Sequence, residues 1–161
     1  MKKQIIYPNL IPRLFASTLD LTLLAIISNP ITTFISWNLS LYFFKTNITK
    51  ITINSMQASE LTEYISTGNL FWYLLLISIM NFLITGAYFV GFWTYYSATP
   101  GKMIMKMTIV DADTLAKPTK WQFVKRFLGY VTILFGIWFV PFSKQHRALH
   151  DRLSGTLVIK S

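Results

Sequence analysis

The sequence predicts an α-helical integral membrane protein with two full spans, a third short membrane segment and a small cytoplasmic pair of strands resembling a β-hairpin. Three observations support this class. Hydrophobic residues make up 53% of the 161 residues and charged residues only 13%, whereas soluble domains carry about 25% charged residues. The apolar residues form long blocks, which a soluble core does not require. The net charge of +9 lies mostly outside these blocks.

The composition also excludes several functional classes. The chain contains no cysteine, which excludes disulfides, thiolate metal sites and thiol nucleophiles. A strong excess of positive charge is typical of proteins that bind nucleic acid or an anionic membrane surface. No nucleic-acid recognition motif accompanies the charge. We therefore expect anionic lipid as a partner, no nucleic acid and no cofactor.

The first expected span covers residues 12–37. Its apolar block runs from Leu14 to Ile35, 22 residues, and a helix rising ~1.5 Å per residue covers a hydrocarbon core of ~30 Å with that length. A signal peptide has a shorter apolar region of ~7–15 residues and a small-residue cleavage site, so we interpret this block as a retained helix. Pro30, directly after Asn29, predicts a kink within it.

The second expected span covers residues 70–96 and follows a polar loop, 38–69. Aromatic residues mark both of its ends, as they do at membrane interfaces. Asn81 and Thr85 share one face, and Ala87 and Gly91 form a pair of small residues one turn apart. We interpret these four residues as helix-packing positions rather than a ligand site.

The third expected membrane segment covers about residues 124–142 and permits two interpretations. Its apolar block, 127–142, has only 16 residues and contains Gly129, Gly136 and Pro141, so it is marginal for a full span. It either crosses the bilayer or enters and returns as a re-entrant hairpin, which is possible where protein buries the irregular backbone. Charge favours the hairpin, because both flanks are basic. Strands expected at 108–111 and 156–160 would then lie on one side and pair.

The distribution of charge predicts the orientation. Of the 15 Lys and Arg residues, 12 lie before the first span, in 97–126 or after residue 142, and Arg13 lies at the amino-terminal edge of that span. The loop 38–69 holds the other two together with two Glu residues. Because basic residues accumulate on the cytoplasmic side, the amino terminus is expected to be cytoplasmic. We expect a multi-pass protein in the inner membrane of a bacterium.

Two charged residues belong to the first span itself, Arg13 at its edge and Asp20 within it. Ionisable groups inside a membrane are costly and are functional candidates by default. Their spacing of seven places them on one helix face, ~10.5 Å apart along the axis. A short Asp side chain does not easily bridge that distance, so a third group is expected between them.

Three stretches of the chain resemble the RDD family, which is named for one arginine and two aspartates. They are Pro12-Arg13-Leu14-Phe15-Ala16-x-x-Leu19-Asp20, then Thr99-Pro100-Gly101-Lys102 with Ile109-Val110-Asp111-Ala112-Asp113, and finally His150-Asp151-Arg152-Leu153-Ser154-Gly155-Thr156. The resemblance covers residues 8–160 as one domain and implies that Arg13, Asp20 and Asp151 are the name-giving residues. The family is usually described with three membrane helices. The loop 38–69 does not match it, and Ser154 replaces a frequent alanine.

The resemblance implies a membrane protein that is not an enzyme, and some members are associated with sodium/proton exchange. Coupled buried carboxylates can bind and release a proton, so the leading interpretation is ion- or proton-coupled transport through Arg13, Asp20 and Asp151. The alternative is a non-catalytic scaffold or assembly factor, in which the same residues form a static polar link because buried polar groups must be paired. Two spans do not easily enclose a path, so we expect a homo-oligomer or a partner membrane protein.

Four further residues are candidates for supporting roles. His150 and Arg152 flank Asp151, and His150 is expected to orient it or to cap the turn. Lys102 and Lys106 lie on one face of a short helix and are candidates for binding a lipid head group or another anion, against the alternative of side chains that extend to the membrane surface. With two histidines and no cysteine, no metal site is expected.

Overall fold

A computed structural model describes residues 6–44, 69–132 and 147–160. The chain divides into two compact units, one formed by Met1–Leu24 with Gly86–Ser161 and the other by Ala25–Thr85. The long helices α1 (Leu10–Phe44) and α3 (Asn69–Tyr96) each contribute to both units. The short elements all belong to the first unit: α4 (Pro100–Ile104), β1 (Met107–Asp111), α5 (Lys120–Leu128), the 3-10 helix η2 (Gly129–Thr132), α7 (Leu149–Leu153) and β2 (Thr156–Lys160).

Helices α1 and α3 are long and apolar enough to cross a membrane. Their 35 and 28 residues correspond to ~52 and ~42 Å, more than the ~30 Å of a hydrocarbon core. The core helix of a soluble protein is mostly buried, whereas only 22% of the most apolar stretch of α1 and 11% of that of α3 is buried. Both expected spans therefore exist as exposed apolar helices, and α1 continues through Pro30.

Two polar contacts connect α1 and α3 within the second unit. The hydroxyls of Ser36 and Tyr73 lie 2.6 Å apart, and the Asn69 amide donates to the carbonyl of Phe43 at 3.3 Å. Both contacts lie toward the end of α1 and the beginning of α3. They satisfy polar side chains that would otherwise face an apolar environment.

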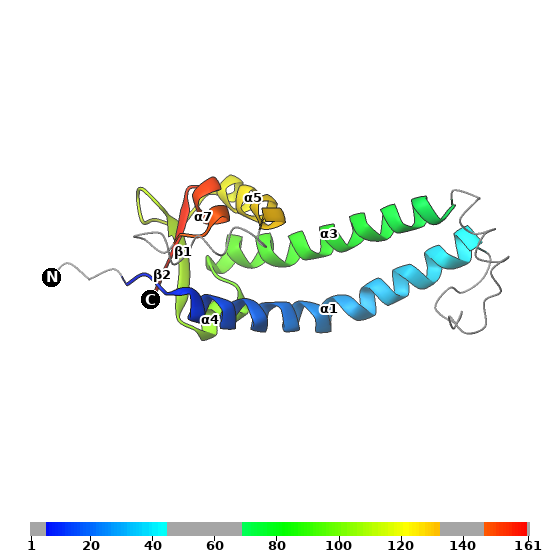
Figure 1. The fold of residues 1–161 in the computed structure, drawn as a ribbon, viewed down its shortest axis with the longest axis horizontal. Coiled ribbons are helices and arrows are strands. Elements are labelled where there is room, and N and C mark those ends of the chain that lie inside the picture. Colours follow the sequence, from blue (N-terminus) through cyan, green and yellow to red (C-terminus); the bar gives the residue numbers. More distant parts are fainter. Residues whose placement is uncertain (1–5, 45–68, 133–146, 161) are drawn as a thin grey trace. The chain divides into compact units, whose positions relative to one another are not determined.

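The strand pair forms as the sequence predicts. β1 and β2 are antiparallel, with Met107 opposite Lys160 and Asp111 opposite Thr156 (Figure 1). The amide of Lys160 also donates to the carbonyl of Ile6 at 2.9 Å, and that of Ile109 to the carbonyl of Ser97 at 2.7 Å. Backbone hydrogen bonds thus join the segment before α1, the segment after α3 and the end of the chain.

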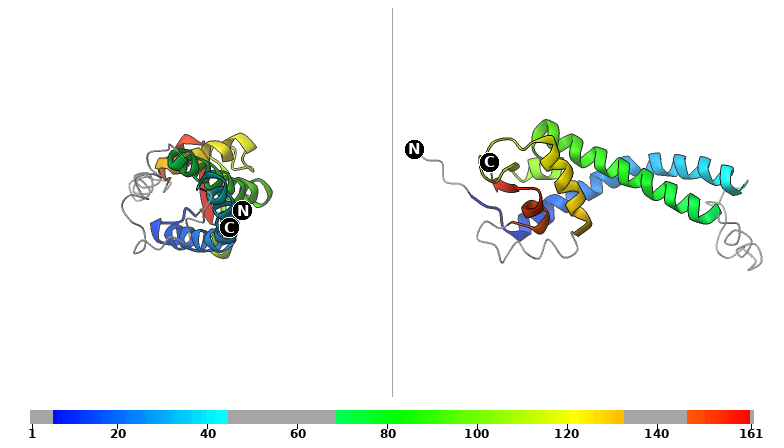
Figure 2. Two further views of the ribbon diagram at one scale, coloured as in Figure 1. Left: turned by 90° about the vertical axis from the view of Figure 1, so that its right-hand side faces the viewer. Right: turned by 90° about the horizontal axis from the view of Figure 1, so that it is seen from above.

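The core of the first unit lies where the strand pair meets the end of α3 and α5. Figure 2 shows α5 in yellow and α7 and β2 in red beside the C-terminal end of α3. Trp93 and Phe123 are fully buried, and their rings lie 6.1 Å apart. Further buried side chains around them are Ala16, Leu24, Phe89, Met107, Ile109, Phe127 and Val158. Apolar side chains from α1, α3, β1, α5 and β2 therefore share one cluster.

The third expected membrane segment falls largely outside the described residues. Its described part is α5, which begins at a complete capping box formed by Thr119 and Gln122, followed by η2 to Thr132. Residues 133–146 are not described, so a third span is not established. Thr99 directly precedes α4, and its side chain makes no capping bond, because its hydroxyl bonds to another element.

Candidate functional site

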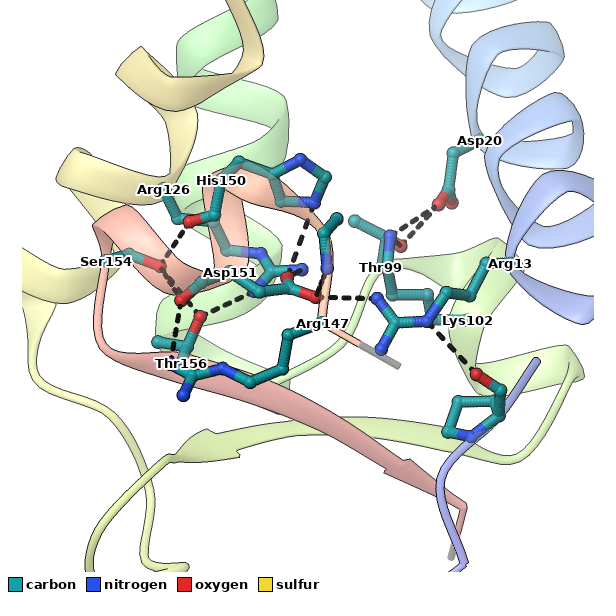
Figure 3. Close-up of polar contacts among 12 residues, drawn as sticks. Arg13, Asp20, Thr99, Lys102, Arg126, Arg147, His150, Asp151, Ser154 and Thr156 are labelled. Carbon is teal, nitrogen blue, oxygen red and sulfur yellow. Dashed lines mark hydrogen bonds and ion pairs between the residues drawn. The ribbon is translucent and has the colours of Figure 1, made fainter. Parts of the chain in front are cut away.

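The carboxylate of Asp151 lies between two arginines (Figure 3). Its Oδ2 is 2.6 Å from Nη1 of Arg13, and its Oδ1 is 2.6 Å from Nη2 of Arg126. Asp151 is completely buried, and the two arginines are almost so. Arg13 comes from the first turn of α1, Arg126 from α5 and Asp151 from α7. One carboxylate therefore joins three elements that are far apart in the sequence.

Local structure holds this carboxylate in place. Oδ2 of Asp151 also accepts a bond from the amide of Ala148 at 3.1 Å, across the first turn of α7. Arg126 donates from Nη1 to Thr156 Oγ1 at 2.6 Å, and the Thr156 hydroxyl lies 2.8 Å from that of Ser154. The guanidinium of Arg126 also lies 5.5 Å from the centre of the Trp93 ring, a favourable cation–π distance. Each charged group is thus oriented by a further partner.

The environment of Asp151 determines its charge state. Burial alone would raise the pKa of its carboxyl, but the positive charges of Arg126 and Arg13 outweigh burial and hold that pKa well below its usual range. The group is therefore a carboxylate at any physiological pH. A carboxylate held in this way is a strong electrostatic link and a poor proton carrier.

His150 contacts the same carboxylate from the neighbouring position. Its Nε2 lies 3.4 Å from Oδ1 of Asp151, and its ring packs edge-on against Tyr130 at 4.7 Å between centres. Burial lowers the pKa of His150 from 6.5 to about 3. The charge of Asp151 opposes this shift, and the positive charges of Arg126, Lys102 and Arg13 add to it. The imidazole is therefore neutral at pH 7.

Asp20 is buried in a second cluster that is built from α1 and the start of α4. The Thr99 hydroxyl donates to its Oδ2, and the amide of Gly101 donates to its Oδ1 at 2.7 Å. Nζ of Lys102 lies 3.5 Å from Oδ2 and 3.3 Å from the Thr99 hydroxyl. Lys102 is only 6% exposed. Both oxygens of Asp20 are therefore engaged by groups at the start of α4.

Gly101 permits this close approach. A Cβ at this position would lie 2.2 Å from the carbonyl oxygen of Ala16 and 2.9 Å from Oδ1 of Asp20. Ala16 belongs to α1, so the clash would be with helix backbone, which does not move easily. The four residues of the motif Thr99-Pro100-Gly101-Lys102 therefore have distinct roles. Thr99 supplies a hydroxyl and Pro100 begins α4. Gly101 lets α1 approach closely, and Lys102 supplies a positive charge.

The sequence predicts one network of three residues, whereas the structure contains two clusters. Arg13 and Asp151 are in direct contact, but Asp20 is paired with Lys102 and Thr99. Lys106 is exposed with a positive φ of 53°, and Arg152 is also exposed. His150 lies against Asp151 as expected.

Sequence reasoning did not identify Arg126 and Thr99 as site residues. Arg126 is one of six basic residues in 97–126, and only its place on the buried face of the capped helix α5 distinguishes it. A helical projection beginning at Thr119 would have placed Arg126 with Phe123 and Phe127 and indicated a buried, paired arginine.

The chemistry available to the two clusters is electrostatic. Three buried cations, Arg13, Arg126 and Lys102, face two buried carboxylates, Asp20 and Asp151. In the described part of the chain, no three His, Cys, Asp or Glu side chains gather closely enough to hold a metal ion. The arrangement cross-links elements and places two carboxylates in a medium of low dielectric constant.

Comparison with known proteins identifies a family. A model of the RDD family matches residues 7–155. The chain is also similar to a protein of Rickettsia prowazekii (strain Madrid E), described as the uncharacterized protein RP437, with 46% identity over 173 residues and the whole of both chains covered. No solved structure matches the chain. RDD domains are found in small membrane proteins, which agrees with the two exposed apolar helices. The chain belongs to the RDD family.

Proposed function

We propose that this protein is a non-catalytic membrane scaffold, which holds a small platform of strands and short helices at the membrane surface. One observation carries the proposal: both family aspartates are buried and engaged in contacts between distant elements. Asp151 joins α1, α5 and α7, and Asp20 joins α1 to α4. Such contacts suit a rigid connection between a membrane helix and a surface unit better than a site that must load and release an ion.

The platform is expected on the cytoplasmic side of a bacterial inner membrane. Backbone hydrogen bonds join the segment before α1 to β2, and β2 to β1, so these segments share one side. A single membrane crossing between Asp111 and Thr156 would separate the paired strands, which favours the re-entrant alternative for the third segment. The excess of basic residues in these regions supports the cytoplasmic assignment.

Anionic lipid is the expected partner of α5. Trp121 is 73% exposed and Leu128 is 52% exposed, and Lys125, between them, is also exposed. These residues follow one face of α5, and Lys120 precedes them. A helix with an exposed tryptophan, apolar residues and lysines is typical of the membrane interface, where the lysines contact anionic head groups. Lys106 adds a further exposed positive charge.

The lipid contact can be tested with the intact protein in nanodiscs. We expect the double variant Lys120→Glu/Lys125→Glu to retain several-fold less phosphatidylglycerol than the wild type, measured by native mass spectrometry. The double variant Lys45→Glu/Lys50→Glu is the matched control, because it makes the same change in charge in the loop expected on the opposite side. Equal lipid retention in the double variant and the control would contradict a lipid-binding platform.

Ion or proton coupling is the second candidate function, and it rests on Asp20. This carboxylate is 1% exposed in a helix long and apolar enough to cross a membrane, and buried ionisable groups in such helices often mark ion paths. Its oxygens and the Thr99 hydroxyl are hard ligands of the kind that small cations prefer. The Lys102 ammonium, 3.5 Å from Oδ2, occupies the place that such a cation would take.

Cation-driven proton movement in proteoliposomes separates the two functions. A scaffold gives no flux from correctly inserted wild-type protein with sodium or potassium at pH 6–9, and Asp20→Asn loses stability. A coupled transporter gives sodium-driven flux that disappears in an Asp20→Asn protein that inserts and folds normally. Asp113→Asn is the control, because Asp113 is exposed. Sodium-driven flux in the wild type and the control, but not in Asp20→Asn, would overturn the scaffold proposal.

A further inference from the structure

The outward face of α1 carries a hollow at the middle of the helix. Its volume is about 790 Å³, and residues between Ile26 and Asn38 line it, including Asn29, Pro30 and Thr33. All the lining residues are exposed and belong to the second unit. Asn29 lies within two residues of the centre of α1 (Leu10–Phe44), at the depth of the hydrocarbon core if the helix spans it.

In the described part of the chain, two polar side chains at this hollow, those of Asn29 and Thr33, have no hydrogen-bond partner. Several other polar side chains of α1 and α3 donate to a backbone carbonyl one turn earlier, as do those of Thr18, Thr22, Thr32, Asn38 and Asn81. Among the described residues, the side chains of Asn29 and Thr33 form no such bond. Pro30 also has no N–H, so the carbonyl of Ile26 lacks its usual helical donor.

These unpartnered groups are costly in lipid, because hydrocarbon offers neither a donor nor an acceptor. An amide, a hydroxyl and a free carbonyl on the same exposed face of a membrane helix are therefore expected to find partners on another helix. The hollow provides the close approach that such bonds need.

We propose that two copies of this chain dock through this face, α1 against α1, with the Asn29 amide of each copy donating to the Ile26 carbonyl of the other. The face is self-complementary: it offers a donor in Asn29 and acceptors in Ile26, Asn29 and Thr33. With a twofold axis through the hollow, the contact of Asn29 in one copy with Ile26 in the other is repeated with the two copies exchanged, as in an isologous interface. A partner of different composition would have to supply the same set of groups.

Cross-linking tests this interface directly, because the chain has no native cysteine. Ile26→Cys places one thiol in the hollow and leaves the Ile26 carbonyl, Asn29 and Thr33 intact. Ile31→Cys is the matched control, since Ile31 is also exposed but lies about 140° away around the helix. Both full-length variants are oxidised in native membranes with copper phenanthroline, and the fraction of disulfide-linked dimer is measured.

We expect Ile26→Cys to give several-fold more dimer than Ile31→Cys. Adding Asn29→Leu, which keeps the side-chain size and removes the amide, should lower the dimer yield of Ile26→Cys about fivefold, given the modest strength of hydrogen bonds between membrane helices. Equal yields from the two cysteine positions, or a yield unaffected by Asn29→Leu, would overturn the proposal. If neither variant gives any dimer, this face is covered by lipid or by another protein, and the proposal is overturned in the same way. The scaffold function does not depend on either result.

Discussion

The surroundings of the two buried aspartates differ in charge and in origin. Asp151 is held by two guanidinium groups, from α1 and α5, and its partner Arg13 is 138 residues away in the sequence. Asp20 is held mainly by neutral donors, the Thr99 hydroxyl and the Gly101 amide, with the Lys102 ammonium at a longer distance. The first aspartate neutralises buried charge, whereas the second completes the start of a short helix beside α1.

This difference indicates which aspartate the fold depends on more. Removing Asp151 leaves two buried arginines without their counter-charge, and an uncompensated buried charge is among the most destabilising defects. Replacing Asp20 by asparagine removes its charge, but the new amide oxygen can still accept the hydrogen bond from the Gly101 amide. Four experiments test the comparison.

The largest expected effect is that of Asp151→Ala. We expect a loss of about 3–5 kcal/mol in the free energy of unfolding, because Arg13 and Arg126 lose their shared partner. Thermal unfolding of detergent-solubilised protein, followed by fluorescence-detected size exclusion, measures it. Asp113→Ala, at an exposed position, is the control and should change stability little. A midpoint for Asp151→Ala equal to that of the control would show that the arginines do not need this carboxylate.

Gly101→Ala should have the next largest effect, about 1–3 kcal/mol, because the new Cβ meets the Ala16 carbonyl at 2.2 Å. Gly91→Ala is a close control, since a Cβ at Gly91 meets nothing within 4 Å and alanine is the better helix former. The two variants should therefore move the unfolding midpoint in opposite directions. If both raise it, α4 does not approach α1 as closely as the structure indicates.

Asp20→Asn should destabilise the protein by about 1–2 kcal/mol, because an amide oxygen can still accept from Gly101 but no longer balances Lys102. The double variant Asp20→Asn/Lys102→Met should lose less than the sum of the two single variants, since it removes both charges together. The same unfolding assay, applied to the four proteins of this cycle, gives the coupling. Strict additivity would mean that Lys102 and Asp20 do not interact energetically.

The smallest effect concerns pH and His150. Burial lowers the pKa of His150 to about 3 in the folded protein, below the 6.5 of an exposed histidine. The unfolded chain therefore binds more protons between these values, and stability must fall as pH falls below 6.5. We expect a loss of about 1 kcal/mol at pH 5.5 relative to pH 7.5.

The variant His150→Gln should flatten this dependence between pH 6.5 and pH 4. The other histidine, His146, lies outside the described residues and provides the control His146→Gln, which should retain the full slope. Unfolding midpoints at several pH values test both variants. An unchanged slope in His150→Gln would assign the pH dependence to other groups. The lowered pKa of Asp151 affects stability only at lower pH, as pH falls below 3.8.

Several elements could be predicted because their signals are local. The apolar lengths of α1 and α3 identify both helices, and the β-branched residues of Thr108–Asp111 and Thr156–Lys160 identify both strands. The family motif identified Arg13, Asp20 and Asp151 as related residues. Thr99 before Pro100 is a pattern typical of a helix cap, but the Thr99 hydroxyl donates to Asp20 in α1 instead.

The sequence by itself determined the long apolar helices, the strand pair and the segments in which positive charge accumulates, because each depends on neighbouring residues and on the thickness of a bilayer. Only the tertiary structure decided which charges meet. Arg126 contacts Asp151 and Lys102 contacts Asp20, whereas Lys106 is exposed, although all three are basic residues of one stretch. Ion pairing depends on distances between side chains brought together by folding, and neither composition nor spacing along the chain contains those distances.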